Sequence, residues 1–417
     1  MIQFNSLLKA FLVVIILRSM MQVYLNELNL FHLRHHQSHI PDAFKEVVDQ
    51  ETFEKISNYS VDSDRFTMVG TLINEGVFVA LLLSGFLPWL DRRILACGWS
   101  QVVNGFFFFG VLSVLANLLR IPLSLYDTFV IEARYGFNTM TMKTWTLDLA
   151  KGLALFMILG GFVLWLLLTL VIYGGRMWWA WAWLMVTGFE LLLLWLFPVV
   201  IAPLFNKFEP LGDKAREDRI RSLMEKVGLQ IKGVFKMDAS KRSKHTNAFF
   251  TGIGKTKRIV LFDTLLQSHP EEELFAVLAH EAGHWKRKHL LKQILLVEIL
   301  SFVVFYGVSK ILDWPLLYQT FGFQEPIAYV GLFLVMTLLG PLNFFVQPLG
   351  AAISRRFERE ADDFSSKLMQ TTEPLCRALR RLAADNLENL IPHPLYAWFY
   401  YSHPPLVERI RRLKCGL

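Results

Sequence analysis

The chain has 417 residues, of which 53% are hydrophobic and 14% aromatic, and its formal net charge is +7. This apolar share excludes an ordinary soluble protein of two or three domains and indicates an integral membrane protein. The basic residues are spread over several loops beside apolar segments and form no single basic surface, so we do not expect nucleic acid to be a partner.

Seven apolar segments are long enough to cross about 30 Å of hydrocarbon as helices. They cover residues 4–25, 67–90, 102–124, 153–173, 178–201, 290–312 and 326–349. The first is interrupted by Lys9 and Arg18, and a signal peptide is its alternative. Because no small-residue cleavage site follows it, we interpret this segment as a membrane anchor.

Seven crossings place the two termini on opposite sides of the membrane and bring the long polar segments to one side. Those segments hold most of the Lys and Arg residues, so the positive-inside bias predicts that this side is cytoplasmic. We expect an N-terminal membrane region (1–201), a cytoplasmic catalytic segment (202–289), two membrane helices (290–349) and a C-terminal catalytic segment (350–417).

Two observations bear on the location of the protein in the cell. The chain has no long insertions and no obvious retrieval signal for the endoplasmic reticulum at its C-terminus. Both favour a bacterial inner membrane, whereas a eukaryotic chain of this kind would lie in the membrane of the endoplasmic reticulum.

Residues 280–284 carry the pattern His-Glu-x-x-His. Two histidines four residues apart share one helix face and can bind one metal ion, and the Glu between them serves as the catalytic carboxylate of zinc proteases. Pro270 and the three glutamates that follow it indicate the start of a helix. We therefore predict one zinc ion bound by His280 and His284, with Glu281 as general base. Two ordinary buried or surface histidines are the alternative.

Catalytic zinc usually takes three protein ligands and leaves one position for water. Glu358 and Asp362, just past the seventh span, are four residues apart and share a helix face. Glu358 could bind the metal, and Asp362 could accept the ring N–H of a zinc histidine. The alternative is a solvated helix whose acidic residues pair with neighbouring arginines. His289 is not expected to be a ligand, because five residues after His284 it should point away from the motif.

Residues 245–253 and 258–266 flank a turn at 254–257 and are rich in β-branched and aromatic side chains, which predicts a β-hairpin. An edge of this hairpin could bind an extended peptide through main-chain hydrogen bonds. A purely structural hairpin beneath the zinc helix is the alternative.

Taken together, these segments resemble the type I CAAX prenyl proteases, a family of seven-span integral-membrane zinc metalloproteases that process farnesylated proteins. In the catalytic half, the resemblance rests on residues 280–289, 357–362 and 401–409. In the membrane half it rests on residues 125–132 and 135–138. Shorter quality-control relatives lack this membrane half, so the resemblance is specific to the CAAX branch.

The resemblance implies a mostly α-helical membrane protein whose seven helices enclose a chamber, with a gluzincin-like catalytic region at its cytoplasmic end. It implies zinc on His280, His284 and Glu358, with Glu281 as the catalytic carboxylate and Asp362 behind the ligands. It also implies that Asn247 lies on a substrate-binding strand and that His403 and Arg409 lie near the scissile peptide, where they would stabilise the oxyanion. Without the resemblance, His403 is a turn residue before two prolines.

We therefore expect a zinc endopeptidase that acts on lipidated (CAAX-type) or amphipathic peptides in contact with the bilayer. A quality-control protease without a lipid requirement has every catalytic residue in common with it and stays open. A transporter or scaffold with structural zinc is disfavoured, because structural zinc sites normally use four protein ligands.

Overall fold

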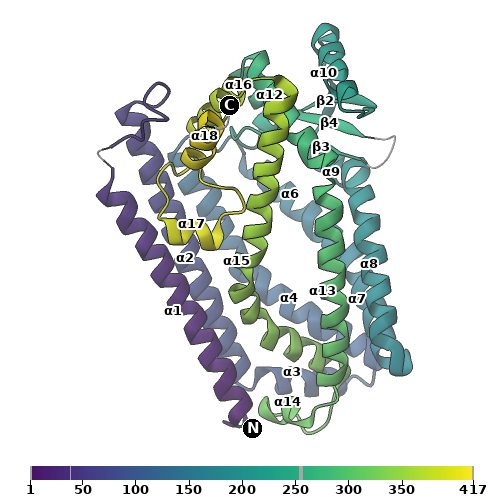
Figure 1. The fold of residues 1–417 in the computed structure, drawn as a ribbon. Helices are drawn as coiled ribbons and strands as arrows, with labels where there is room; N and C mark the ends of the chain where they lie inside the picture. The colour runs from purple at the N-terminus through teal and green to yellow at the C-terminus, as the bar shows by residue number, and fades with distance from the viewer. Residues whose placement is uncertain (1, 38, 253–256, 416–417) are drawn as a thin grey trace.

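The computed structural model describes residues 2–37, 39–252 and 257–415. Long helices run between two ends of the molecule (Figure 1). One end holds the N-terminus with α3 and α14, and the other holds the small sheet and the C-terminus. The two termini thus lie at opposite ends of the bundle, as an odd number of crossings requires.

Within the described residues, seven helical segments are long and apolar enough to cross a membrane, which confirms the predicted number. They are α1 (Ser6–His35), α2 (Gln50–Leu83), α4 (Gln101–Tyr126) continued by α5 (Glu132–Arg134), α6 (Met142–Leu155) continued by α7 (Gly161–Tyr173), α8 (Trp178–Leu196) continued by α9 (Ala202–Phe205), α13 (His289–Ile311) and α15 (Ala328–Met369). The shorter helices are α3 (Phe86–Leu95), α10 (Lys214–Lys226), α11 (Asp263–Ser268), α12 (Glu271–Lys286), α14 (Pro315–Thr320), α16 (Glu373–Asp385), α17 (Pro394–Tyr400) and α18 (Leu406–Cys415).

The second predicted span is wrong at its end. It was expected to continue to residue 90, but α2 ends at Leu83 and a separate helix, α3, begins at Phe86. Gly85 between them has φ +78°, a left-handed conformation that glycine adopts without a steric penalty. The chain therefore turns here, and α3 lies near α14 at the N-terminal end of the bundle (Figure 1).

A four-stranded sheet lies at the catalytic end, with the strand order β1-β2-β4-β3. The strands are β1 (Phe208–Pro210), β2 (Gly233–Met237), β3 (Ala248–Thr251) and β4 (Arg258–Phe262). β3 and β4 pair antiparallel, which confirms the predicted hairpin, although residues 263–266 belong to α11 and most of the predicted turn, residues 254–256, lies outside the described residues. β2 pairs parallel with β4 and antiparallel with β1, so the hairpin is half of a larger sheet with β3 at one edge.

One hydrophobic core joins this sheet to α10 and α12. Ile220 and Met224 of α10, Ile259 and Leu261 of β4 and Leu278 of α12 are fully buried against one another. Burial of each such side chain stabilises the fold by about 1.5–3 kcal/mol. This core fixes α12, and with it the His-Glu-x-x-His motif, against the sheet whose edge is β3.

Candidate active site

Two helices supply the predicted metal ligands. α12 carries His280 and His284, α15 carries Glu358, and the two helices pack against each other. Gly283 lies at their closest approach, where a Cβ atom would be 3.0 Å from the Cα and 3.2 Å from the carbonyl oxygen of Ala361. Our sequence reasoning missed this role of Gly283. A glycine inside a helix, which costs about 1 kcal/mol relative to alanine, was the available signal.

The donor atoms of the three predicted ligands converge. His284 Nε2 lies 3.2 Å from Glu358 Oε1, His280 Nε2 lies 3.3 Å from Glu358 Oε2, and the two Nε2 atoms are 3.2 Å apart. One donor atom from each residue lies within 4.8 Å of the other two. Bonds of about 2.0–2.2 Å to a tetrahedral zinc ion place neighbouring donors about 3.4 Å apart, close to these spacings.

The chemistry of this group also fits zinc. Glu358 Oε2 is buried and has no hydrogen-bond partner within the described part of the chain, so a carboxylate oxygen is left for a cation. Two imidazoles and one carboxylate are a donor set of catalytic zinc, which keeps a fourth position for water. His280, His284 and Glu358 are therefore the residues that would hold the ion.

Asp362 and Arg409 lie behind the ligands. Asp362 Oδ1 is 2.9 Å from His280 Nδ1, the position expected for a carboxylate that orients a zinc histidine. Arg409, from α18, donates from Nε and Nη2 to the two oxygens of Asp362 at 3.0 and 2.6 Å. Burial alone would lower the pKa of Arg409, but the Asp362 carboxylate raises it above its ordinary value, so the guanidinium stays charged.

The structure places Arg409 on the buried side of the ligands, whereas the sequence-based expectation placed it beside the peptide. Arg409 was expected near the scissile peptide, yet its side chain is only 7% exposed and is committed to Asp362. Its Nη2 atom is 3.7 Å from Glu358 Oε2. Arg409 therefore reaches the ligands from the buried side, through a bidentate ion pair that fixes its orientation.

Glu281 and His403 lie on the accessible side of the ligands. His403 Nε2 is 3.3 Å from Glu358 Oε1, Ser402 Oγ is 2.9 Å from His403 Nδ1, and the side chain of His403 is 59% exposed. Although the His403 side chain is largely exposed, partial desolvation by the surrounding protein lowers its pKa. Burial raises the pKa of Glu281, against the opposing effect of His280 and His284. A carboxylate of raised pKa is a stronger base than an ordinary glutamate.

The prediction that His289 points away from the motif is wrong. α12 ends at Lys286, Lys288 adopts a left-handed φ of +55°, and a new helix begins at His289, so helical spacing does not continue past the break. His289 Nδ1 consequently lies 3.1 Å from His284 Nδ1, and His289 Nε2 lies 3.2 Å from Glu360 Oε2. His289 is not in the group of converging donors, but it lies behind His284 much as Asp362 lies behind His280.

Asn247 is exposed and directly precedes the edge strand β3. Its side-chain oxygen accepts a hydrogen bond from the N–H of Ala248 at 2.8 Å, and its carbonyl oxygen accepts one from the N–H of Phe262 at 3.1 Å. Because β3 has a partner on only one side, its other edge has backbone groups that an extended peptide can pair with.

Comparison with known families covers both halves of the chain. Residues 29–207 match the family model for the CAAX prenyl protease N-terminal region with five membrane helices, and residues 210–415 match the model for peptidase family M48. CAAX prenyl protease 1 homolog from Arabidopsis thaliana is 36% identical over 382 residues, which cover 90% of each chain. CAAX prenyl protease 1 from Saccharomyces cerevisiae is 35% identical, covering 90% of this chain and 89% of the relative.

The chain belongs to the type I CAAX prenyl protease family. Its structure is similar to the crystal structure of S. mikatae Ste24p, with a TM-score of 0.92 and 32% identity over 99% of this chain and 100% of the other. As a member of this family, the protein is a multi-pass membrane metalloendopeptidase. The family, the fold class and the enzyme class expected from the sequence are confirmed.

Proposed function

We propose that this protein uses one zinc ion to hydrolyse peptide bonds near the C-terminus of lipidated, CAAX-type peptides. The observation that carries this proposal is the convergence of His280, His284 and Glu358 within 4.8 Å beside Glu281. The names of the relatives, CAAX prenyl protease 1, support the choice of substrate.

When bound, zinc supplies Lewis acidity, which makes water more acidic and a peptide carbonyl more electrophilic. Glu281 accepts the proton of the attacking water and passes it to the leaving amine nitrogen. His403, exposed beside Glu358, donates a hydrogen bond to the oxygen that becomes negative during attack. Asp362 fixes the ring of His280, and Arg409 fixes Asp362, so we assign Arg409 a positioning role.

The peptide itself would bind along the free edge of β3. Main-chain hydrogen bonds to this edge hold an extended segment whatever its side chains are. Asn247 lies directly before the first residue of β3. α12 lies beside β3, so a peptide on this edge runs close to the zinc helix.

A cavity among the membrane helices favours a lipidated substrate over an unlipidated one. It has a volume of about 940 Å³ and lies between α1, α2, α4 and α15. Most of its lining is apolar, and Arg18 and Glu75 form an ion pair of 2.8 Å on one wall. A cavity of this size, with a mostly apolar lining and a minority of polar residues, suits an apolar chain carrying a polar peptide.

The positive-inside bias leads us to place the catalytic end on the cytoplasmic face. This orientation applies equally to a bacterial inner membrane and to the membrane of the endoplasmic reticulum. Peptide substrates bearing a lipid would then reach the site from the cytoplasmic leaflet.

Cleavage of a farnesylated CAAX peptide and its unlipidated twin by detergent-purified protein tests the proposal. We expect chelator-sensitive cleavage and a kcat/KM at least about tenfold higher for the farnesylated peptide, since each buried CH₂ contributes about 0.8 kcal/mol. Equal cleavage of the two peptides would favour the quality-control alternative. Chelator-resistant cleavage would contradict a role for the metal.

A further inference from the structure

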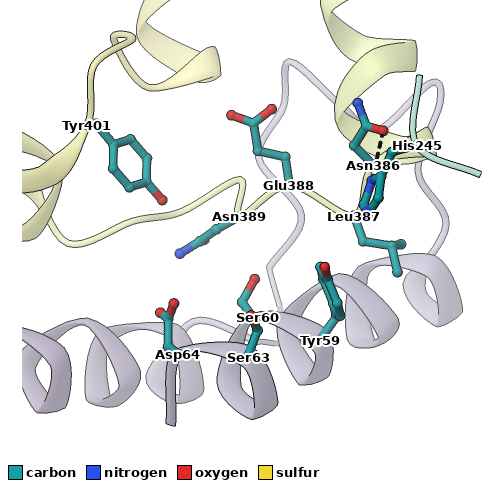
Figure 2. A pocket seen from close by; sticks show the side chains of 10 residues that line it. All are labelled: Tyr59, Ser60, Ser63, Asp64, His245, Asn386, Leu387, Glu388, Asn389 and Tyr401. Carbon is teal, nitrogen blue, oxygen red and sulfur yellow. Dashed lines mark hydrogen bonds between the residues drawn. The ribbon is translucent and has the colours of Figure 1, made fainter. Parts of the chain in front are cut away.

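A second cavity, lined mainly by polar residues, lies between α2 and the loop after α16. Its volume is about 260 Å³, and Figure 2 shows the ten side chains that line it. One wall is α2, from Tyr59 to Asp64, and the facing wall is the loop after α16, from Asn386 to Asn389. The remaining lining residues are His245 and Tyr401.

The cavity is lined by residues from two parts of the proposed peptide site. These are the segment just before β3 and the segment that leads to His403. Asn386 Oδ1 accepts a hydrogen bond from the N–H of Thr246 at 2.9 Å and lies 3.2 Å from His245 Nδ1, so the loop is tied to the residues just before β3. Tyr401 precedes His403 by two positions. A peptide that continues past the edge of β3 therefore meets this cavity.

The cavity is acidic and lacks a cation of its own. Asp64 and Glu388 both line it, and none of its ten lining residues is Lys or Arg. Asp64 is bonded only to Asn29 Nδ2, at 3.1 Å, and Glu388 has no side-chain hydrogen bond or ion pair among the described residues. Glu388 is solvent-exposed and Asp64 is partly exposed, so both carboxylates are open to a ligand. A recess lined by two carboxylates and by no Lys or Arg attracts a cationic side chain.

A third polar group of the cavity, the side-chain amide of Asn389, lies beside Tyr401. The side-chain Nδ2 of Asn389 is buried and makes no hydrogen bond of good geometry within the part of the chain that the structure describes, although the Tyr401 side chain lies close enough to interact with it. Figure 2 draws this nitrogen on the side of Tyr401 and Asp64. The Asn389 amide donor requires a hydrogen-bond acceptor, whereas the carboxylates of Asp64 and Glu388 require a donor or a cation. A metal cation alone supplies no acceptor for the amide. A peptide with a basic side chain supplies both, through its main-chain carbonyl and its ammonium or guanidinium group.

We propose that this cavity is a specificity subsite that binds a Lys or Arg side chain of the peptide substrate, close to the scissile bond. Asp64 and Glu388 pair with the cation, and Asn389 donates to the main chain of the same segment. The proposal rests on the proposed peptidase function. Charge-assisted hydrogen bonds of this kind should favour a basic residue over an uncharged one of the same shape by about tenfold or more.

The test compares peptides that carry lysine or norleucine, which keeps the four-carbon stem of lysine without the ammonium group, at each position flanking the cleaved bond. The readout is the ratio of kcat/KM for the two peptides, because a change in folding, zinc content or catalysis affects both and cancels. Wild-type protein should prefer lysine by about tenfold at one position. The double variant Asp64→Asn/Glu388→Gln should bring this ratio close to one.

The double variant Asp42→Asn/Glu54→Gln is the matched control, because it removes the same net charge from exposed residues outside the cavity. It should keep the wild-type ratio, and the single variant Glu388→Gln serves if the cavity double variant does not fold. A wild-type ratio near one at every position, or a preference that persists without the two carboxylates, would overturn the subsite while the proposed peptidase stands. Failure of wild-type protein to cleave any peptide would overturn the peptidase and the subsite with it.

Discussion

The substitution Gly283→Ala should weaken the zinc site without altering any ligand. The added Cβ would lie 3.0 Å from Ala361 Cα, 3.1 Å from Phe364 Cβ and 3.2 Å from the carbonyl oxygen of Ala361. Ordinary carbon contacts are about 3.5–4.0 Å, so α12 and α15 must separate by about 0.5 Å. Two of the three contacted atoms belong to the backbone and cannot rotate away.

The expected size of the effect follows from two opposing contributions. Overpacking of this kind costs about 1–3 kcal/mol. The higher helix propensity of alanine offsets about 1 kcal/mol of that cost. The net loss of stability is thus at most about 2 kcal/mol. Because the histidines are on α12 and Glu358 is on α15, the same separation displaces the ligands, and kcat/KM should fall about tenfold.

The assay measures zinc content, thermal unfolding in detergent and kcat/KM for Gly283→Ala beside Gly350→Ala. Gly350 is also within α15, but a Cβ there meets nothing within 4 Å, so this control gains helix propensity without a clash. If Gly283→Ala retains the zinc affinity and activity of Gly350→Ala, the helix separation we infer does not occur and the reasoning is refuted.

Three further predictions concern the groups around the metal. Asp362→Asn should lower zinc affinity by about 10–100-fold in a competition assay with a chelator, because His280 loses its carboxylate partner; unchanged affinity would mean that Asp362 does not orient the ring. Arg409→Lys should also lower zinc affinity, since lysine cannot form the bidentate pair, and in a double-mutant cycle it should add little to Asp362→Asn; full additivity would separate Arg409 from Asp362. A chelator should abolish cleavage and zinc should restore it, whereas restoration by magnesium alone would contradict a nitrogen-rich site.

The sequence predicted those parts of the site that follow from local helical spacing. His280 and His284, like Glu358 and Asp362, are four residues apart on continuous helices, so their shared faces could be derived without a structure. The failed prediction for His289 shows the limit of this reasoning. Lys288, directly before His289, has a left-handed conformation and interrupts the helix. A positive φ at a lysine cannot be predicted from the residue type.

Long-range packing accounts for what the sequence could not supply. The contact of Gly283 with Ala361, the pairing of Arg409 with Asp362 and the parallel pairing of β2 with β4 all join residues that are far apart in the chain. A single sequence contains no observation of such contacts. The polar cavity between α2 and the loop after α16 escaped prediction for the same reason, since Asp64 and Glu388 are 324 positions apart by their numbering.

The most direct test of the central claim is a single-turnover cleavage assay on Glu281→Gln, with zinc content measured on the same sample. Glutamine has nearly the shape of glutamate but cannot accept the proton of water, and the three ligands are untouched. We predict one zinc ion per chain, wild-type thermal stability to within about 1 kcal/mol and loss of cleavage by at least about 100-fold. Wild-type cleavage by the zinc-loaded variant would contradict the account.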